Sequence, residues 1–511
     1  MISCVGLFFS ALSFLVHCGV RDVGLGMFWL AFIFSIAALP WLAPLAVRMR
    51  VLSSVIAILV LGTVFGPAFF SVQGPVSLSL DRFLWMAALF VLGLRMVRRS
   101  ESITPLHRLD FVVIGLVFWA LLSCLRFGMF DAEQPPIARW LFYIAIPASM
   151  YFIARTGFGN DGKGLTSSIN ALVSVMVCLG TYLAVTAVFE MLDLRSLVFP
   201  RFINDPEVWE FYGRGRGPLL NPAGNGIVMT VSLSACVIRF FSVGRLGKLL
   251  YGGLAVVVLA GCYATLTRSV WCGAAMALAI MGMLYVPVKV RVVAFAMTIV
   301  FAGAMTLGLK EQLLSMKRDK ALSASEAAKS VELRPLLATV AWEMFKDRPI
   351  GGHGFGQYLT AAEPYHTIRS HGIPLENVRP YVQHNVFLSL LVDLGLIGLL
   401  LHVLFVFSVL CIAWRLSRMH PDGMPQRQIG MLTIGAFSGY FCNGMFHDVS
   451  VIEMVHTYLF TLAGMTVTVW VHCDALVPAA KTAPSVLCRR EADRVPQHAG
   501  FEGALSPSAH R

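Results

Sequence analysis

The sequence predicts an all-α polytopic membrane protein with about 12–14 transmembrane helices. Of its 511 residues, 57% are hydrophobic and only 13% are charged, and the mean hydropathy is +0.74. A soluble chain carries about a quarter charged residues. The apolar residues form runs of about 18 or more, which is enough to cross a hydrocarbon core of about 30 Å. These runs do not alternate with polar residues, so they predict helices rather than the strands of an outer-membrane barrel.

Fourteen apolar runs are expected to form helices, and two or so of them are expected to be half-helices or interfacial segments. They span residues 3–20, 25–46, 51–70, 80–97, 110–126, 138–154, 168–192, 222–242, 249–266, 270–286, 291–309, 385–413, 429–447 and 452–472. The first run lacks a basic n-region and is expected to be a retained helix rather than a signal peptide.

Polar breaks divide the chain into four parts. The predicted parts are transmembrane helices over 1–309 with an outer-face loop at 193–221, one long extracytoplasmic loop over 310–383, C-terminal transmembrane helices over 384–473, and a disordered cytoplasmic tail over 474–511. The tail has no apolar period and is rich in Pro, Ser and Ala, which is typical of disorder.

Basic residues predict the orientation of the chain. With the N-terminus in the cytoplasm, the short inside loops hold sixteen Lys and Arg residues and the short outside segments hold nine. This bias predicts a multi-pass protein of the cytoplasmic membrane with both termini inside and both long breaks outside. The net charge of +12 arises in these short loops and not in a basic stripe, so no nucleic-acid partner is expected. The eleven cysteines include no CxxC pair, so neither a disulfide framework nor structural zinc is expected.

Arginines on the outer face run against that bias. Arg268 lies in a tight link, "TLTRSVW", between two apolar helices. An arginine in such a place is costly unless it is solvated or paired, which makes it a functional candidate. The alternative is a loop residue whose long side chain reaches the membrane surface.

Four polar patches fall on the predicted outer face. They are "GRGRGPLLNPAGNG" (213–226), "LTRSVWCGAAMAL" (266–278), "ELRPLLATVAWEMFKDRPIGGHGFGQY" (332–358) and "RPYVQHNVFLSLLVDLGLIGLLL" (379–401). In this order they resemble the O-antigen ligase and O-antigen polymerase superfamily of bacterial inner-membrane glycosyltransferases. That family shows an arginine before a Gly and Asn-Pro helix start, Ser-Arg between two helices, an Arg…Trp helix running into a glycine-rich turn, and His-Asn where the chain re-enters the membrane. Thr267 stands here for the family's serine and Asp393 for its glutamate.

The resemblance implies a fold of the type C glycosyltransferase kind. It also implies transfer of a glycan from an undecaprenyl-diphosphate donor to an acceptor hydroxyl outside the cytoplasmic membrane, without nucleotide, metal or other cofactor. Guanidinium groups bind diphosphate oxygens bidentately, so Arg216, Arg268 and Arg334 are the expected clamps. Arg216 is preferred to Arg214 because it directly precedes the Gly-Pro pattern.

His384 is the expected general base. An imidazole has an ordinary pKa of about 6.5 and can take a proton from the acceptor hydroxyl at neutral pH. Direct attack is expected to invert the anomeric centre, since no carboxylate nucleophile appears beside it. The secondary candidates are Arg214 as an alternative clamp, Asn385 beside His384, and His447, which could touch the acceptor.

Several other polar residues are expected to be structural. Asp393 lies nine residues after His384, on the opposite face of a straight helix and about 13 Å deeper. It is expected to bond a neighbouring helix, and Gly395 to be a close-packing position. "GGHGFGQY" follows no strand and is expected to be a turn, with His353 at the rim of the site.

Polar side chains near the last two helices and in the long loop could bind a ligand or could simply contact solvent. His447, Asp448, Glu453 and His456 could ligate a metal in principle, but such clusters at a helix–loop–helix mouth are more often solvated, so no metal site is expected. For the long-loop residues there are two alternatives: contact with the acceptor, or exposure to solvent. These residues are His366, His371 and Glu376.

Two other functions remain open from the sequence. A transporter or flippase of lipid-linked sugars also needs many helices, but transporters tend to show repeated halves and broken midplane helices. The chain shows no repeat, and its polar groups gather on one face, which favours the enzyme. Within the enzyme class the acceptor is lipid A core for a ligase, a growing polysaccharide for a polymerase, or a protein hydroxyl for a protein O-oligosaccharyltransferase.

Overall fold

The computed structural model describes most of the chain between residues 51 and 472. The described residues are 51–72, 78–97, 104–128, 135–156, 162–208, 210–285, 289, 324–419 and 421–472. The predicted helices at 3–20, 25–46 and 291–309, the first part of the predicted long loop, and the predicted tail at 474–511 lie outside them.

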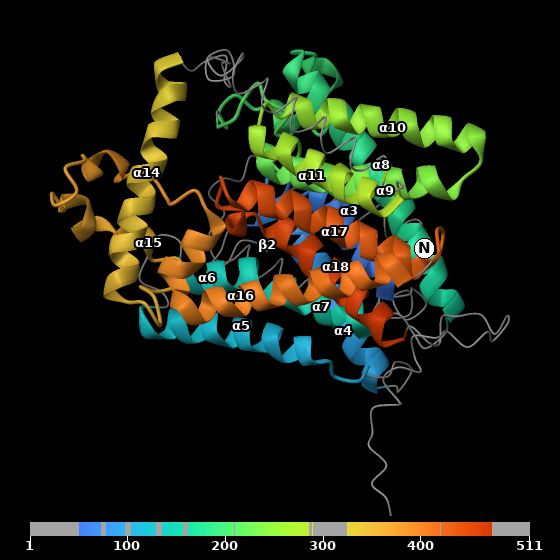
Figure 1. The fold of residues 1–511 in the computed structure, drawn as a ribbon, viewed down its shortest axis with the longest axis horizontal. Coiled ribbons are helices and arrows are strands. Elements are labelled where there is room, and N and C mark those ends of the chain that lie inside the picture. The colour runs from blue at the N-terminus through green and yellow to red at the C-terminus, as the bar shows by residue number, and fades with distance from the viewer. Residues whose placement is uncertain are drawn as a thin grey trace, which may run out of the picture.

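The described chain is a bundle of helices, as Figure 1 shows. The eleven predicted segments that fall on described residues are all helical, and eight helical segments are long and apolar enough to cross a membrane. These eight are α5 (Arg108–Arg126), α6 to α7 (Pro136–Thr156), α8 (Gly162–Met191), α9 (Pro222–Ser242), α10 (Arg245–Ala264), α11 (Arg268–Tyr285), α16 (Val386–Met419) and α18 (Glu453–Val471). The all-α polytopic membrane fold is thereby confirmed.

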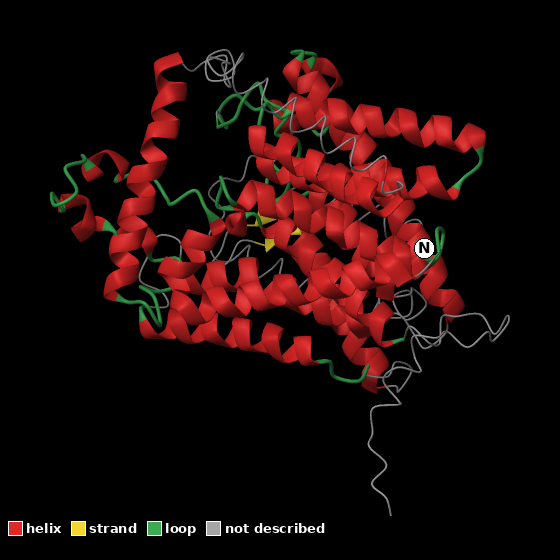
Figure 2. Cartoon of the chain, viewed as in Figure 1, coloured by secondary structure: helices red, strands yellow, loops and turns green. Residues whose placement is uncertain are grey.

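Shorter and less apolar elements complete the bundle. Helices α3 (Val51–Val64), α4 (Leu80–Val97) and α17 (Pro425–Gly444) pack among the eight, and a π-helical turn η1 (Leu141–Ala145) joins α6 (Pro136–Trp140) to α7 (Ile146–Thr156). Strands β1 (Ser71–Val72) and β2 (Leu78–Ser79) pair antiparallel between α3 and α4, and they are the small arrows in Figure 2. Short 3-10 turns η2 (Arg195–Leu197), η3 (Arg201–Asn204) and η6 (Val449–Val451) lie in the links.

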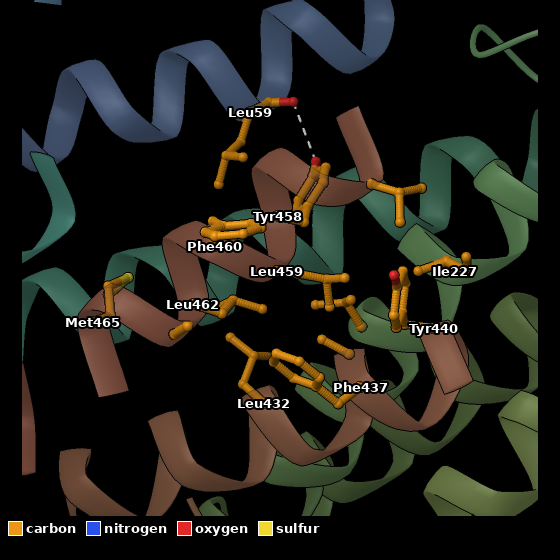
Figure 3. Packing of buried hydrophobic residues seen from close by; sticks show 14 of the residues in the cluster. Leu59, Ile227, Leu432, Phe437, Tyr440, Tyr458, Leu459, Phe460, Leu462 and Met465 are labelled. Atoms are coloured by element: carbon orange, nitrogen blue, oxygen red, sulfur yellow. Dashed lines mark hydrogen bonds between the residues drawn. The ribbon is translucent and has the colours of Figure 1, made fainter. Parts of the chain in front are cut away.

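Helix α18 is the centre of the bundle. Of the residues in its span, 89% are buried, against 17% for α10 at the periphery. Figure 3 shows Tyr458 and Phe460 of α18 among side chains of α9 and α17, and the Tyr458 hydroxyl donates a hydrogen bond to the Leu59 carbonyl at 3.2 Å. The outer helices expose large apolar side chains such as Phe118 and Phe407, which is the surface that a lipid environment requires.

From α8 to α11, and again from α16 to α18, each helix packs beside the next and runs antiparallel to it, so the links in these two series alternate between two ends of the bundle. One end carries residues 192–221, 265–267, 324–385 and 445–452, and we call it the site end. Contacts across this end confirm the arrangement, because Ser269 at the start of α11 bonds Asn443 at the end of α17. All four motif patches found in the sequence therefore lie at the same end.

The predicted long loop contains a small helical subdomain. It comprises α14 (Ala324–Asp347), α15 (Tyr358–Ala361), η4 (Glu363–Thr367) and η5 (Leu375–Val378), which Figure 1 shows beside the bundle at the left. Leu337, Val340 and Met344 recur at helical spacing on α14 and are buried against Val378 and against Val392 of α16. The apolar face of α14 therefore builds a core outside the main bundle and attaches it to the first turns of α16.

Helix α16 is broken at Gly395, which corrects the expectation of a straight helix. Gly395 has φ 68° and ψ −168°, a conformation that is essentially restricted to glycine. The turn after α14 docks at this break: the Leu396 amide donates to the Pro349 carbonyl at 2.8 Å, and the His353 amide donates to the Val392 carbonyl at 2.8 Å. The backbone groups that the break releases are thus bonded by the external turn.

Replacing Gly395 by alanine is expected to destabilise the protein. A Cβ there would lie 2.2 Å from the Ile350 carbonyl oxygen, and the backbone conformation itself costs about 1–3 kcal/mol for a residue with a side chain. We expect Gly395→Ala to lower the free energy of unfolding by about 3 kcal/mol or more, measured by thermal unfolding in detergent.

The matched control is Gly282→Ala in α11, where a Cβ would meet no atom within 4 Å. This variant should unfold at the wild-type temperature or slightly above it, because alanine favours a helix over glycine by about 1 kcal/mol. Equal unfolding temperatures for the two variants would contradict the role assigned to the break.

Candidate active site

The loop between α8 and α9 is organised around Arg216. Its guanidinium donates to four backbone carbonyls, those of Val208, Glu210 at 2.8 Å, Ile203 at 2.7 Å and Asp205 at 3.3 Å. The side chain is 0% exposed, and burial lowers the pKa of the guanidinium from its ordinary value. The sequence predicted that Arg216 binds the donor diphosphate, whereas the structure shows its donors holding the 203–210 loop.

Substitution of Arg216 by lysine is expected to loosen this loop. A lysine carries the same charge but offers one compact ammonium in place of the planar fork that reaches four carbonyls. We expect Arg216→Lys to lower the free energy of unfolding by about 2–4 kcal/mol, measured by fluorescence-detected thermal unfolding. Arg201→Lys, at an exposed arginine of the same loop, is the control and should be neutral. An Arg216→Lys protein as stable as the wild type would contradict this structural role of Arg216.

Arg214 joins the first motif patch to the second. Its guanidinium donates to the Thr267 hydroxyl at 2.5 Å and to the Thr265 carbonyl at 3.2 Å, and the side chain is 1% exposed. Next to it, the Gly215 amide donates to the Ala264 carbonyl at 2.9 Å. The loop of the first patch is therefore fastened to the α10–α11 link that carries Arg268.

Arg268 is held in place through the residues on both sides of it. Thr267, the preceding residue, accepts a hydrogen bond from the Arg214 guanidinium. The following residue, Ser269, donates a hydrogen bond from its hydroxyl to the Asn443 amide oxygen at 2.9 Å. Arg268 is the first residue of α11 and is half-buried. A guanidinium at a helix N-terminus adds its charge to the positive end of the helix dipole, so this place favours an anion.

The link between α17 and α18, residues 445–452, contacts the patches 332–358 and 379–401 and lies next to the partner of the patch 266–278. The Arg334 guanidinium of α14 lies 5.3 Å from the centre of the Phe446 ring. The Asn385 amide donates to the Met445 carbonyl at 3.0 Å. Since Asn443 accepts the Ser269 hydroxyl just before this link, the surroundings of Arg268, Arg334 and His384 are connected through it.

His384 directly precedes α16 at this meeting point. Asn385 caps the helix, because its side-chain oxygen accepts from the Phe387 and Leu388 amides at 2.9 and 3.0 Å. His384 is exposed and has φ 46°, in the left-handed region that residues with a side chain rarely adopt. Residues held in such conformations cluster at functional sites. Leu220 and Leu266 in the first two patches share this left-handed backbone.

Two further predicted residues lie in or near the same link. The His447 amide bonds the Asn443 carbonyl at 2.8 Å, which places His447 directly after the end of α17. Asp448 accepts from the Ser450 amide at 3.2 Å and so shapes η6. The surrounding helix ends desolvate Asp448 and raise the pKa of its carboxyl from the ordinary value.

The acidic and imidazole groups of the predicted polar cluster have separate partners. Glu453 pairs with Arg82 of α4 at 2.9 Å, and His456 bonds the Tyr143 carbonyl at 2.7 Å. Within the described ranges, no three His, Cys, Asp or Glu side chains are arranged to hold a metal ion. His456 is buried in the bundle and not solvated as expected, because it joins α18 to the α6–α7 segment.

Asp393 fastens the glycine-rich turn to α16. Its carboxylate accepts from the Gly356 amide at 2.8 Å, and its carbonyl accepts from the Gly354 amide at 3.1 Å. The glycine-rich turn is therefore the partner of the Asp393 carboxylate, and the Asp393 carbonyl also accepts from the Ser123 hydroxyl of the neighbouring helix α5 at 3.5 Å. His353, predicted at the rim of the site, is buried instead, with Nε2 at 2.7 Å from the Met344 carbonyl.

The middle of the chain is similar to a known protein family. Residues 253–403 match the O-antigen ligase family model. The matched segment runs from α10 into α16 and contains Arg268, Arg334 and His384, so the resemblance seen in the motifs is confirmed there. Arg216 and His447 lie outside it. No curated protein matches the chain. The O-antigen ligase match supports a glycosyltransferase activity of the ligase or polymerase type.

Sequence reasoning missed the residues that bring the motifs together. Asn443 is fully buried near the end of α17 and accepts a hydrogen bond from the Ser269 hydroxyl. The Phe446 ring lies against the Arg334 guanidinium. A side-chain amide inside an apolar helix was the available signal for Asn443, because such a group needs a partner in the membrane. No comparable signal exists for Phe446, since one more phenylalanine in an apolar chain carries no information about its neighbours.

Proposed function

We propose that this protein transfers a glycan from an undecaprenyl-diphosphate-linked donor to an acceptor hydroxyl on the outer face of the cytoplasmic membrane. The observation that carries the proposal is that Arg334, the neighbour of Arg268 (Ser269) and the neighbour of His384 (Asn385) all contact the stretch 443–446. Arg268, Arg334 and His384 all belong to the segment that matches the O-antigen ligase family. An exposed imidazole at the same end of the bundle as two half-buried guanidiniums suits a reaction that takes one proton and releases an anion.

In the proposed reaction His384 takes the proton of the acceptor hydroxyl. The acceptor oxygen forms a bond to the anomeric carbon while the bond from that carbon to the diphosphate oxygen breaks, and the anomeric centre inverts. Negative charge then grows on the departing lipid diphosphate, where Arg268 and Arg334 stabilise it. No step needs an oxidant or a nucleotide, because the diphosphate is itself the leaving group.

The site end is proposed to face the periplasm, with both termini in the cytoplasm. Arg239, Arg245 and Arg415 lie toward the opposite end of the bundle, in agreement with the positive-inside rule. A membrane-impermeant maleimide added to intact spheroplasts should label His384→Cys and leave Asp422→Cys, in the exposed link at the opposite end, unlabelled until the membrane is opened. The reverse pattern would overturn the orientation.

The deciding experiment is the surface glycan profile of a strain that lacks the protein. Loss of every repeat from the lipid core, with carrier-linked polymer accumulating, indicates a ligase. Retained single repeats without long chains indicate a polymerase, and loss of glycan from proteins alone indicates a protein O-oligosaccharyltransferase. An unchanged profile of all three glycan classes would refute the proposed transfer. Carrier-linked glycan trapped at the cytoplasmic face would indicate a flippase.

A further inference from the structure

The external subdomain carries a groove that the proposed reaction does not use. It encloses about 420 Å³ between the end of α14, the glycine-rich turn, α15 and η4, and Phe127 after α5 forms one wall. That volume lies within the range of about 300–1,000 Å³ that is usual for small-molecule sites. The turn joins α16 at Val392, about 9 Å along the helix from its first residue, Val386, so the groove lies apart from His384.

Two acceptor groups in the groove are held in fixed positions. The Asp347 carboxylate receives the Tyr365 hydroxyl at 2.6 Å. The His353 ring lies 2.7 Å from the Met344 carbonyl through Nε2, so Nε2 carries the proton and Nδ1 is an acceptor. Burial lowers the pKa of His353, which keeps the ring neutral at pH 7. Within the described residues no protein group bonds Nδ1, although the side chain is only 8% exposed.

Further polar and aromatic groups complete the lining. Gln357 donates its amide to the Phe127 and Gly128 carbonyls at 3.3 Å, which fixes the side chain and leaves its oxygen as an acceptor. The Arg348 guanidinium stands 5.1 Å from the centre of the Phe127 ring and offers donors. The Tyr365 ring meets His353 edge to face, at 5.7 Å between the ring centres.

This lining combines rigid aromatic surface with both acceptors and donors. A sugar ring has the complementary chemistry, because its C–H face packs on an aromatic ring and its hydroxyls each donate and accept. A lipid chain would offer no donor to the second oxygen of the Asp347 carboxylate or to Nδ1 of His353. A diphosphate is disfavoured because Asp347 cancels the charge of Arg348.

We propose that this groove is a saccharide subsite, which holds a sugar unit of the glycan substrate away from the bond that reacts. The proposal rests on the proposed glycan transfer for the origin of that glycan, either the donor repeat or the acceptor. Its binding chemistry follows from Asp347, Arg348, His353 and Tyr365 alone.

The test is oligosaccharide binding to the full-length protein in nanodiscs, measured by calorimetry and saturation-transfer NMR. The two probes are a repeat-unit oligosaccharide released from its lipid carrier and a core oligosaccharide released from lipid A. We expect at least one to bind, and Asp347→Asn and Arg348→Gln each to weaken that binding about tenfold. Arg369→Gln, at an exposed arginine of the same subdomain, is the control and should bind as wild type does.

The outcomes separate the sources and the two proposals. Binding of the repeat alone assigns the groove to the donor, and binding of the core alone assigns it to the acceptor. If neither probe binds, or if Asp347→Asn and Arg348→Gln bind unchanged, the subsite is refuted. His384→Asn should still bind the oligosaccharide while transfer stops. If the wild-type protein binds the oligosaccharide through Asp347 but shows no transfer activity, the proposed function is refuted and the subsite stands.

Discussion

Replacing His384 by asparagine is expected to abolish glycan transfer while the protein stays folded in the membrane. Asparagine tolerates the left-handed backbone that His384 adopts, so the start of α16 should keep its geometry. It cannot take a proton from the acceptor hydroxyl, and loss of a positioned general base costs about 10²–10⁴ in rate. The rate is measured with purified protein, a lipid-diphosphate donor and the acceptor that the glycan profile identifies.

Two companion variants show whether the loss is chemical. His384→Ala removes the imidazole and also strains the backbone, so it should be both inactive and less stable than His384→Asn. Asn385→Ala leaves the imidazole but removes the cap of α16, which costs about 0.5–2 kcal/mol of stability. A His384→Asn protein that retains more than a tenth of wild-type activity would remove His384 from the role of base.

Neutralising Arg268 or Arg334 is expected to lower transfer about 10²–10³-fold for each substitution, the usual effect of removing one group that stabilises charge in a transition state. Arg268→Gln and Arg334→Gln keep hydrogen-bonding capacity but lose the positive charge that we propose stabilises the departing diphosphate. The affinity for undecaprenyl diphosphate alone should fall in the same variants, because the product carries the full charge.

Lysine at these positions separates charge from shape. Arg268→Lys and Arg334→Lys should recover part of the activity, since they restore the charge without the bidentate fork. Arg201→Gln, in the exposed part of the α8–α9 loop, is the matched control and should keep wild-type rates. Unchanged affinity for the carrier diphosphate in both glutamine variants would exclude the two arginines as clamps.

The helices could be read from the sequence because the membrane imposes a single rule on each of them. An apolar run of sufficient length has to be helical when no water is present to satisfy its backbone, whatever its neighbours are. For this reason α9 and α18 lie where their apolar runs predict them, within a residue or so. The end of the bundle at which the motifs gather also followed from the alternation of the links.

The role of Arg216 could not be read from the sequence. Its partners are backbone carbonyls in the 203–210 loop. Every residue has a carbonyl, so the order of side chains does not predict which carbonyls Arg216 binds. The break at Gly395 was hidden for a related reason. Glycine is common in transmembrane helices as a packing residue, and only the position of Ile350 shows that a Cβ is excluded there. α14 was expected only from the resemblance, because its polar residues conceal a narrow apolar face.

The break in α16 also bears on how the chain enters the membrane and on how it can be recombined. The Leu396 amide finds its partner, the Pro349 carbonyl, only after the external turn has folded against the helix. Until then this amide would meet lipid without a hydrogen bond, so insertion of α16 and folding of the subdomain are coupled steps. A chimaera that exchanges the external loop between related proteins should therefore carry residues 349–356 and 392–397 as one cassette. Separating them would pair a broken helix with a foreign turn.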